Sequence, residues 1–157
     1  MTATHDDRSA LVGRVLDGLR HYPGVLRTVN DTVARHHDLG PTDGEALLLV
    51  LDAEDRGRPW NPSQLAEALG VTTAGTTTVL DRLQARSLIE RRPDPADRRR
   101  VTLHVTDTGH RVAAAILAPA GDAVGAVLED LDDEELRVLL RTLEALDSAL
   151  ASALRAS

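Results

Sequence analysis

The sequence predicts a mainly α-helical protein with a small β-wing, in which a winged helix-turn-helix core is flanked by N- and C-terminal helices. Three observations support this fold class. A short capped helix, a tight turn and a second helix follow one another between residues 61 and 86. Two strand-like segments joined by a turn rich in Pro and Asp come next, between residues 87 and 105. Helical apolar patterns occupy both flanks of this region.

The first helix of the core starts at residues 61–64, where the local signals agree. Asn61 can cap the free backbone N–H groups of the first turn, and Pro62 suits the first helical position because its missing N–H costs nothing there. Gln64 stands three residues after Asn61, as a capping box requires. Gly70 then ends the helix.

The second helix is predicted from Thr73 to Arg86, with Thr72 as its N-cap. Positions with a helical spacing of 3, 4 and 7 form its expected buried face: Thr76, Val79, Leu80 and Leu83. The other face is polar and is expected to be exposed: Thr73, Thr77, Thr78, Asp81 and Arg82.

The wing is expected to contain two strands. Residues 87–92 form the first strand candidate, and residues 93–97 form the turn. Residues 98–105 alternate, with Val101, Leu103 and Val105 on one face and Arg100, Thr102 and His104 on the other.

Charge is distributed unevenly along the chain, whose net charge is −7. Residues 82–100 contain seven of the eighteen arginines and three acidic residues, a local charge of +4, whereas residues 119–157 carry −6. A polyanion such as double-stranded DNA responds to the local patch, within a Debye length of about 8–10 Å. The basic segment therefore favours DNA as a partner, although a GC-rich genome also explains the exclusive use of Arg over Lys.

Composition excludes several classes of function. The chain has no Cys, so disulfides, thiolate metal sites and cysteine-based peroxide sensing are excluded. The six histidines lack metal-ligand spacing, and no Gly-rich phosphate loop or nucleophile motif occurs. We therefore expect neither a cofactor nor an enzyme. No apolar run approaches 18 residues and the N-terminus is acidic, which predicts a cytoplasmic protein without a membrane span or a signal peptide.

The N-terminal flank predicts helices over residues 8–20 and 25–39, either as one helix bent near Pro23 or as two helices in series. A further helix starts near Pro41, with Thr42 as its expected cap, and is apolar on all sides over residues 46–51. Trp60 is expected to be a packing anchor rather than a ligand contact.

The C-terminal flank begins with Thr106, the expected cap of a helix over residues 107–130 that is bent near Pro119. The last helix places six apolar residues at alternating steps of 3 and 4: Leu136, Leu139, Leu143, Leu146, Leu150 and Ala153. This spacing is typical of a coiled-coil seam, so we expect a homodimer. The alternative is that the seam packs on the protein's own first helix.

Five segments resemble the MarR family of dimeric winged-helix transcription regulators: residues 65–71 (LAEALGV), 80–83 (LDRL), 88–91 (LIER), 94–99 (DPADRR) and 105–109 (VTDTG). The resemblance covers roughly residues 39–115. It departs from the family pattern at Ser87, where Gly is usual, and at Thr78, where many members carry a basic residue. It implies dimerisation helices in residues 1–40 and 106–157, on either side of a DNA-binding lobe in residues 41–105.

The resemblance also implies site residues. The DNA-binding candidates are Thr72, Thr73, Thr77, Thr78, Arg82, Arg98, Arg99 and Arg100. Asp97 would hold the wing turn. Family members often bind small aromatic or phenolic acids in a crevice beside the dimer lobe, where the polar candidates are His21, Tyr22 and Arg27. Arg27 would pair with a carboxylate, or else it is simply a solvated helix residue.

Together, these features predict a sequence-specific DNA-binding regulator. We expect a repressor that binds an inverted-repeat operator as a homodimer and is released by a small molecule. The alternative is a winged-helix protein that has lost DNA binding and acts through protein contacts.

Overall fold

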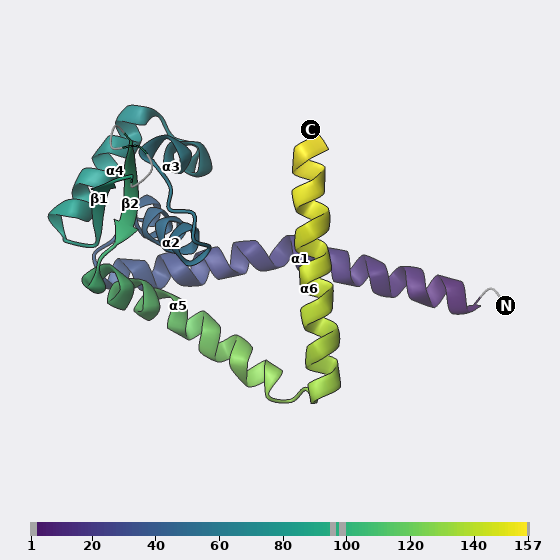
Figure 1. Ribbon diagram of the computed structural model, residues 1–157. Coiled ribbons are helices and arrows are strands. Elements are labelled where there is room, and N and C mark those ends of the chain that lie inside the picture. The colour runs from purple at the N-terminus through teal and green to yellow at the C-terminus, as the bar shows by residue number, and fades with distance from the viewer. Residues whose placement is uncertain (1–2, 95–96, 98–99, 157) are drawn as a thin grey trace. The chain divides into compact units, whose positions relative to one another are not determined.

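The computed structural model describes residues 3–94, 97 and 100–156. It contains two compact units, Met1–Ala120 and Gly121–Ser157. The order of elements (Figure 1) is α1 (Ala3–His36), α2 (Pro41–Asp55), α3 (Pro62–Leu69), α4 (Thr73–Ala85), β1 (Ile89–Pro93), β2 (Val101–Val105), α5 (Asp107–Leu128) and α6 (Asp133–Ala156). The predicted fold class, mainly α with a small β-wing, is confirmed. The predicted division at residues 41–105 stays a prediction.

An aliphatic core holds the first unit together, as a chain without Phe requires. Residues from α1 to α5 contribute to one cluster that includes Ala34, Leu47, Leu65, Leu80, Leu83, Leu103 and Ile116. Trp60 packs against this cluster, and its backbone C=O accepts the N–H of Leu103 in β2 at 2.8 Å. The predicted packing role of Trp60 is therefore confirmed.

The start of α2 differs from the prediction. The N-cap is Gly40, which has no side chain to bond the first turn, and Pro41 is the first helical residue. The predicted cap, Thr42, is therefore wrong: the fixed φ of Pro41 already suits the first helical position, so the helix starts at Pro41, before Thr42.

The helix α1 continues through Pro23. Of the two predicted alternatives, one helix rather than two helices in series is therefore correct.

The wing is an antiparallel pair in which Ile89 faces Val105 and Pro93 faces Val101. Ser87 precedes it with φ = 56°, in the left-handed region where Gly is preferred, so β1 begins later than expected. The face of β2 that carries Thr102 and His104 is covered as well. Thr102 is buried and His104 is mostly buried, because α2 supplies a carboxylate to that face.

The helix α5 begins as predicted, because Thr106 Oγ1 accepts the Gly109 N–H at 3.0 Å. By length and composition, α5 is the one described helix apolar enough to cross a membrane. Core helices of soluble proteins share this length and composition. Its first turns belong to the lobe core, where Gly109, Ala113 and Ile116 are buried.

The helix α6 starts at an acidic turn, where Asp132 Oδ1 accepts the N–H groups of Glu134 and Glu135. Its predicted seam is largely exposed in the single chain, with Leu139 37%, Leu143 48% and Leu150 65% accessible. Exposure of an apolar stripe of this kind to water is energetically unfavourable.

Candidate nucleic-acid interface

The two helices of the helix-turn-helix are fixed by local hydrogen bonds. Asn61 Oδ1 accepts the N–H groups of Ser63 and Gln64, and Gln64 Oε1 accepts the Asn61 N–H, which completes the predicted capping box. Gly70 ends α3 in the left-handed conformation, with φ = 64°. Thr72 Oγ1 then accepts the Gly75 N–H at 3.1 Å and caps α4. The turn therefore holds α4 rigidly behind α3.

The outer face of α4 is polar and exposed, as predicted, while Thr76, Val79, Leu80 and Leu83 are buried. The Thr77 and Thr78 hydroxyls donate to the C=O groups of Thr73 and Ala74, at 3.0 and 3.1 Å. Their protons are therefore used within the helix. These side chains keep oxygen lone pairs and a methyl group to offer to a ligand, which suits amino groups and thymine methyls of base edges.

Arg82 has an internal partner that sequence reasoning missed. Its Nε donates to Asp43 Oδ2 at 2.9 Å and its NH2 to Asp43 Oδ1 at 2.5 Å. The Asp43 side chain is 10% exposed and the Arg82 side chain 50%. The hydrogen bond to the carboxylate raises the pKa of Arg82. The pair ties α4 to the first turn of α2, while half of the Arg82 side chain as a whole remains exposed.

Three further arginines of the basic segment also have internal partners. Arg86 donates to the backbone C=O groups of His37 and Asp38, both at 2.6 Å, where it satisfies acceptors at the end of α1. Arg91 pairs with Asp81 at 3.3 Å, and Arg92 pairs with Glu90. The local charge of +4 therefore overstates what this surface offers to DNA, because Asp43 and Asp81 lie outside residues 82–100.

The tip of the wing is only partly described. Asp94 N–H donates to Arg100 C=O at 3.0 Å, and Arg100 N–H donates to Asp97 C=O at 2.8 Å, so the turn is closed by backbone bonds. Asp97 and Arg100 are exposed. Arg98 and Arg99 lie outside the described residues.

The base of the wing is anchored to the end of α2 by Glu54. Its Oε2 accepts the Val105 N–H at 2.9 Å, and its Oε1 lies 2.8 Å from His104 Nδ1. His104 Nε2 in turn lies 3.0 Å from Thr102 Oγ1. Burial raises the pKa of Glu54, but the hydrogen bonds from His104 and Val105 outweigh it, so the pKa is lowered overall. The carboxylate is therefore favoured in its charged, hydrogen-bonded form.

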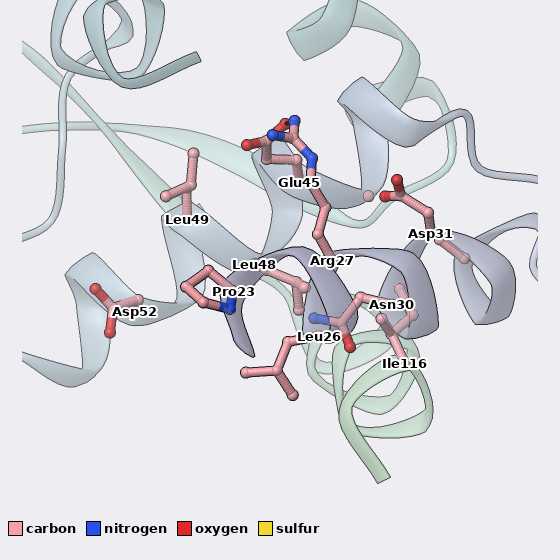
Figure 2. Close-up of a pocket in the computed structure, with 12 residues that line it drawn as sticks. Pro23, Leu26, Arg27, Asn30, Asp31, Glu45, Leu48, Leu49, Asp52 and Ile116 are labelled. Carbon is pink, nitrogen blue, oxygen red and sulfur yellow. Dashed lines mark hydrogen bonds and ion pairs between the residues drawn. The ribbon is translucent and has the colours of Figure 1, made fainter. Parts of the chain in front are cut away.

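A cavity of about 420 Å³ lies among α1, α2 and the start of α5 (Figure 2). Its lining residues are Pro23, Leu26, Arg27, Asn30, Asp31, Ala34, Gly44, Glu45, Leu48, Leu49, Asp52 and Ile116. The volume is within the range of small-molecule sites. Of the predicted effector residues, Arg27 lines this cavity and bonds Glu45 at 2.5 Å, whereas His21 and Tyr22 are exposed and are not part of the wall.

A capped helix-turn-helix with an exposed polar second helix, followed directly by a two-stranded wing, defines a winged helix-turn-helix protein. A family model described as MarR family matches residues 37–100. Residues 37–100 are therefore similar to the MarR family of DNA-binding transcription regulators, and the matched curated relatives are described as HTH-type transcriptional regulators or repressors.

Two relatives illustrate the match. The chain is 24% identical over 132 residues to YsmB of Bacillus subtilis (strain 168), an uncharacterized HTH-type transcriptional regulator, covering 84% of this chain and 88% of YsmB. It is 29% identical over 99 residues to the transcriptional repressor MprA of Escherichia coli (strain K12), covering 61% of this chain and 56% of MprA. The alignment with MprA thus spans little more than half of that repressor.

Two solved structures share the fold. A MarR family protein from Bacillus stearothermophilus superposes with a TM-score of 0.69 at 20% identity, covering 91% of this chain and 97% of that one. MepR of S. aureus in complex with DNA superposes with a TM-score of 0.56 at 20% identity, covering 84% and 93%.

Proposed function

We propose that this regulator binds an inverted-repeat operator as a homodimer, represses transcription from it, and is released by a small molecule in the cytoplasm. The observation that carries the proposal is the outer face of α4. It is exposed, polar and held in place by the Thr72 cap and the turn after Gly70. A helix presented in this way suits the major groove, where its first turns read base edges.

Reading of the operator is divided between α4 and the wing. Thr72, Thr73, Thr77 and Thr78 would meet thymine methyls, amino groups or phosphates, and the exposed half of Arg82 would reach a phosphate. Arg98, Arg99 and Arg100 would enter the adjacent minor groove, where narrow A·T-rich segments concentrate negative potential. Asp97 would hold the wing turn.

Exposed apolar side chains support dimerisation. On α1 they recur at Leu11, Val12, Val15, Leu16 and Leu19, each more than 40% exposed, and on α6 at Leu139, Leu143 and Leu150. A second copy of the chain would bury both stripes. Two recognition helices related by a two-fold axis then require half-sites one helical turn apart. The relative MprA, itself a repressor by name, supports repression as the outcome.

The cavity beside α2 supports release by a small molecule with an apolar, aromatic body. Glu45 in its wall is two residues from Asp43, which holds Arg82 of the recognition helix. A ligand in this cavity would therefore lie beside the turn of α2 that positions α4.

The proposal is tested by isolating genomic fragments that bind the protein, followed by fluorescence polarisation on the operator found. Arg99→Ala should weaken binding by about 1–3 kcal/mol, most strongly on sites with an A·T-rich flank. Arg111→Ala is the control, because it removes the same charge from an exposed position of α5. If no fragment is enriched, or if Arg99→Ala binds like the wild type, the protein acts through other contacts and the proposal is wrong.

A further inference from the structure

The charges around the cavity point to a particular class of ligand. Three carboxylates line it (Asp31, Glu45 and Asp52), against one guanidinium, that of Arg27. We propose that the cavity binds an amphiphilic organic cation, with an apolar body against the leucines and an ammonium group beside Asp31. This inference rests on the proposed effector site and specifies its ligand.

The one basic group in the wall is already neutralised. Arg27 NH2 lies 2.5 Å from Glu45 Oε2, and Figure 2 shows the two side chains meeting while Asp31 projects separately from α1. Asp52 has a partner as well, Arg56 at 2.9 Å. A carboxylate ligand would have to displace Glu45 to reach Arg27, and it would still face Asp31 and Asp52. The wall therefore opposes an acid.

Asp31 is the carboxylate left for a ligand. It is partly buried and, among the described residues, no ion-pair partner for it occurs. A partly buried carboxylate interacts with an adjacent cation more strongly than one in bulk water does, because the effective dielectric constant is lower. No aromatic ring is among the lining residues, so a cation–π contact is not an alternative source of affinity.

Asn30, the neighbour of Asp31, carries a buried acceptor that would be stabilised by a hydrogen-bond donor from the ligand. Its side-chain Oδ1 is buried and has no hydrogen-bond partner. A buried acceptor without a donor is unfavourable, and an ammonium group brings up to three N–H donors, whereas a carboxylate brings none. The apolar wall of Leu26, Leu48 and Leu49 suits the body of the same molecule. Charge and hydrogen bonding thus favour the same ligand class.

Calorimetry on the full chain with three probes that share one ring system tests this directly. The probes are 2-naphthylmethylammonium, 2-naphthylmethanol and 2-naphthoate. We expect the ammonium to bind at least tenfold more tightly than the naphthoate, with the alcohol in between. Asp31→Asn should weaken ammonium binding about tenfold and leave alcohol binding unchanged. Asp17→Asn is the matched control, because Asp17 is an exposed residue of the same helix outside the cavity wall.

The inference is overturned if the naphthoate binds as tightly as the ammonium, if Asp31→Asn leaves ammonium affinity unchanged, or if none of the probes binds. Because the titration contains no DNA, its outcome is separate from operator binding. Ammonium binding by a protein that enriches no genomic fragment would support the cation site and refute the regulatory role. Operator binding by a protein that prefers naphthoate would support the regulatory role and refute the cation site.

Discussion

The ion pair between Arg82 and Asp43 joins the recognition helix to α2, and its removal should affect both folding and DNA binding. Arg82→Gln shortens the side chain and removes its charge, which leaves the Asp43 carboxylate, 10% exposed, without its guanidinium. Asp43→Asn keeps one acceptor oxygen but removes the negative charge. These two variants and their combination form a double-mutant cycle.

The magnitude follows from the unequal burial of the partners. Breaking a fully buried pair costs about 3–5 kcal/mol, whereas an exposed pair contributes about 0–1 kcal/mol. Asp43 is nearly buried and Arg82 is half exposed, so we expect Arg82→Gln to lower the free energy of unfolding by roughly 1.5–3 kcal/mol. Asp43→Asn should cost roughly 1 kcal/mol, because an amide oxygen still accepts one hydrogen bond. The coupling energy should be about 1–2 kcal/mol.

Urea denaturation of all four proteins at one fixed protein concentration measures these values, since dimer stability depends on concentration. A coupling energy below about 0.3 kcal/mol would show that the two residues act independently. Operator binding at several salt concentrations then separates two roles of Arg82. If it only positions α4, both single variants lose affinity with unchanged salt dependence. If it also binds a phosphate, Arg82→Gln alone lowers the salt slope by about 1.

Three further substitutions have expected outcomes. Gly109→Ala should destabilise the lobe by about 3 kcal/mol or more in urea, because the new Cβ would lie 2.0 Å from the Leu88 C=O oxygen, whereas Gly121→Ala, with open space around it, should not. Glu54→Gln should destabilise the protein most near pH 7. In the wild type the pKa of Glu54 is lowered, so the charged carboxylate stabilises the fold above about pH 4.5 and this stabilisation is lost as pH falls further. The difference in urea midpoints between the wild type and Glu54→Gln should therefore shrink at low pH. Leu143→Asp should abolish the dimer in sedimentation equilibrium, unlike Thr142→Asp on the same helix, and a dimeric Leu143→Asp protein would refute the seam.

The features that the sequence predicted correctly are those whose partners are near in the chain. Asn61 bonds Gln64 three residues away, and Thr106 bonds Gly109 at the same spacing. The buried face of α4 follows from helical periodicity alone. In each case, a short fixed separation determines the geometry, so residue type and spacing are sufficient.

The features that the sequence did not predict depend on distant partners. Arg82 meets Asp43 across 39 positions, and His104 meets Glu54 across 50. Neither residue spacing nor local charge indicates these two pairs. Each depends on a carboxylate of α2 that only the tertiary fold brings close. The cavity has the same origin, since its wall combines residues from three helices.

The helix α2 connects three of the surfaces that the proposed function uses: the cavity, the outer helix α4 and the wing. Its first turn holds Arg82 through Asp43 and faces the cavity through Glu45, and its last turn holds the wing through Glu54. Gly44, between the two acids of the first turn, lies so close to α1 that an added Cβ would be 2.9 Å from the Ala34 Cβ. A ligand that enters between α1 and α2 at this contact and displaces α2 would therefore also move α4 and the wing, the two elements proposed to contact DNA. If the proposed release by a small molecule occurs, it would require no long pathway, because the single helix α2 contacts the cavity, α4 and the wing.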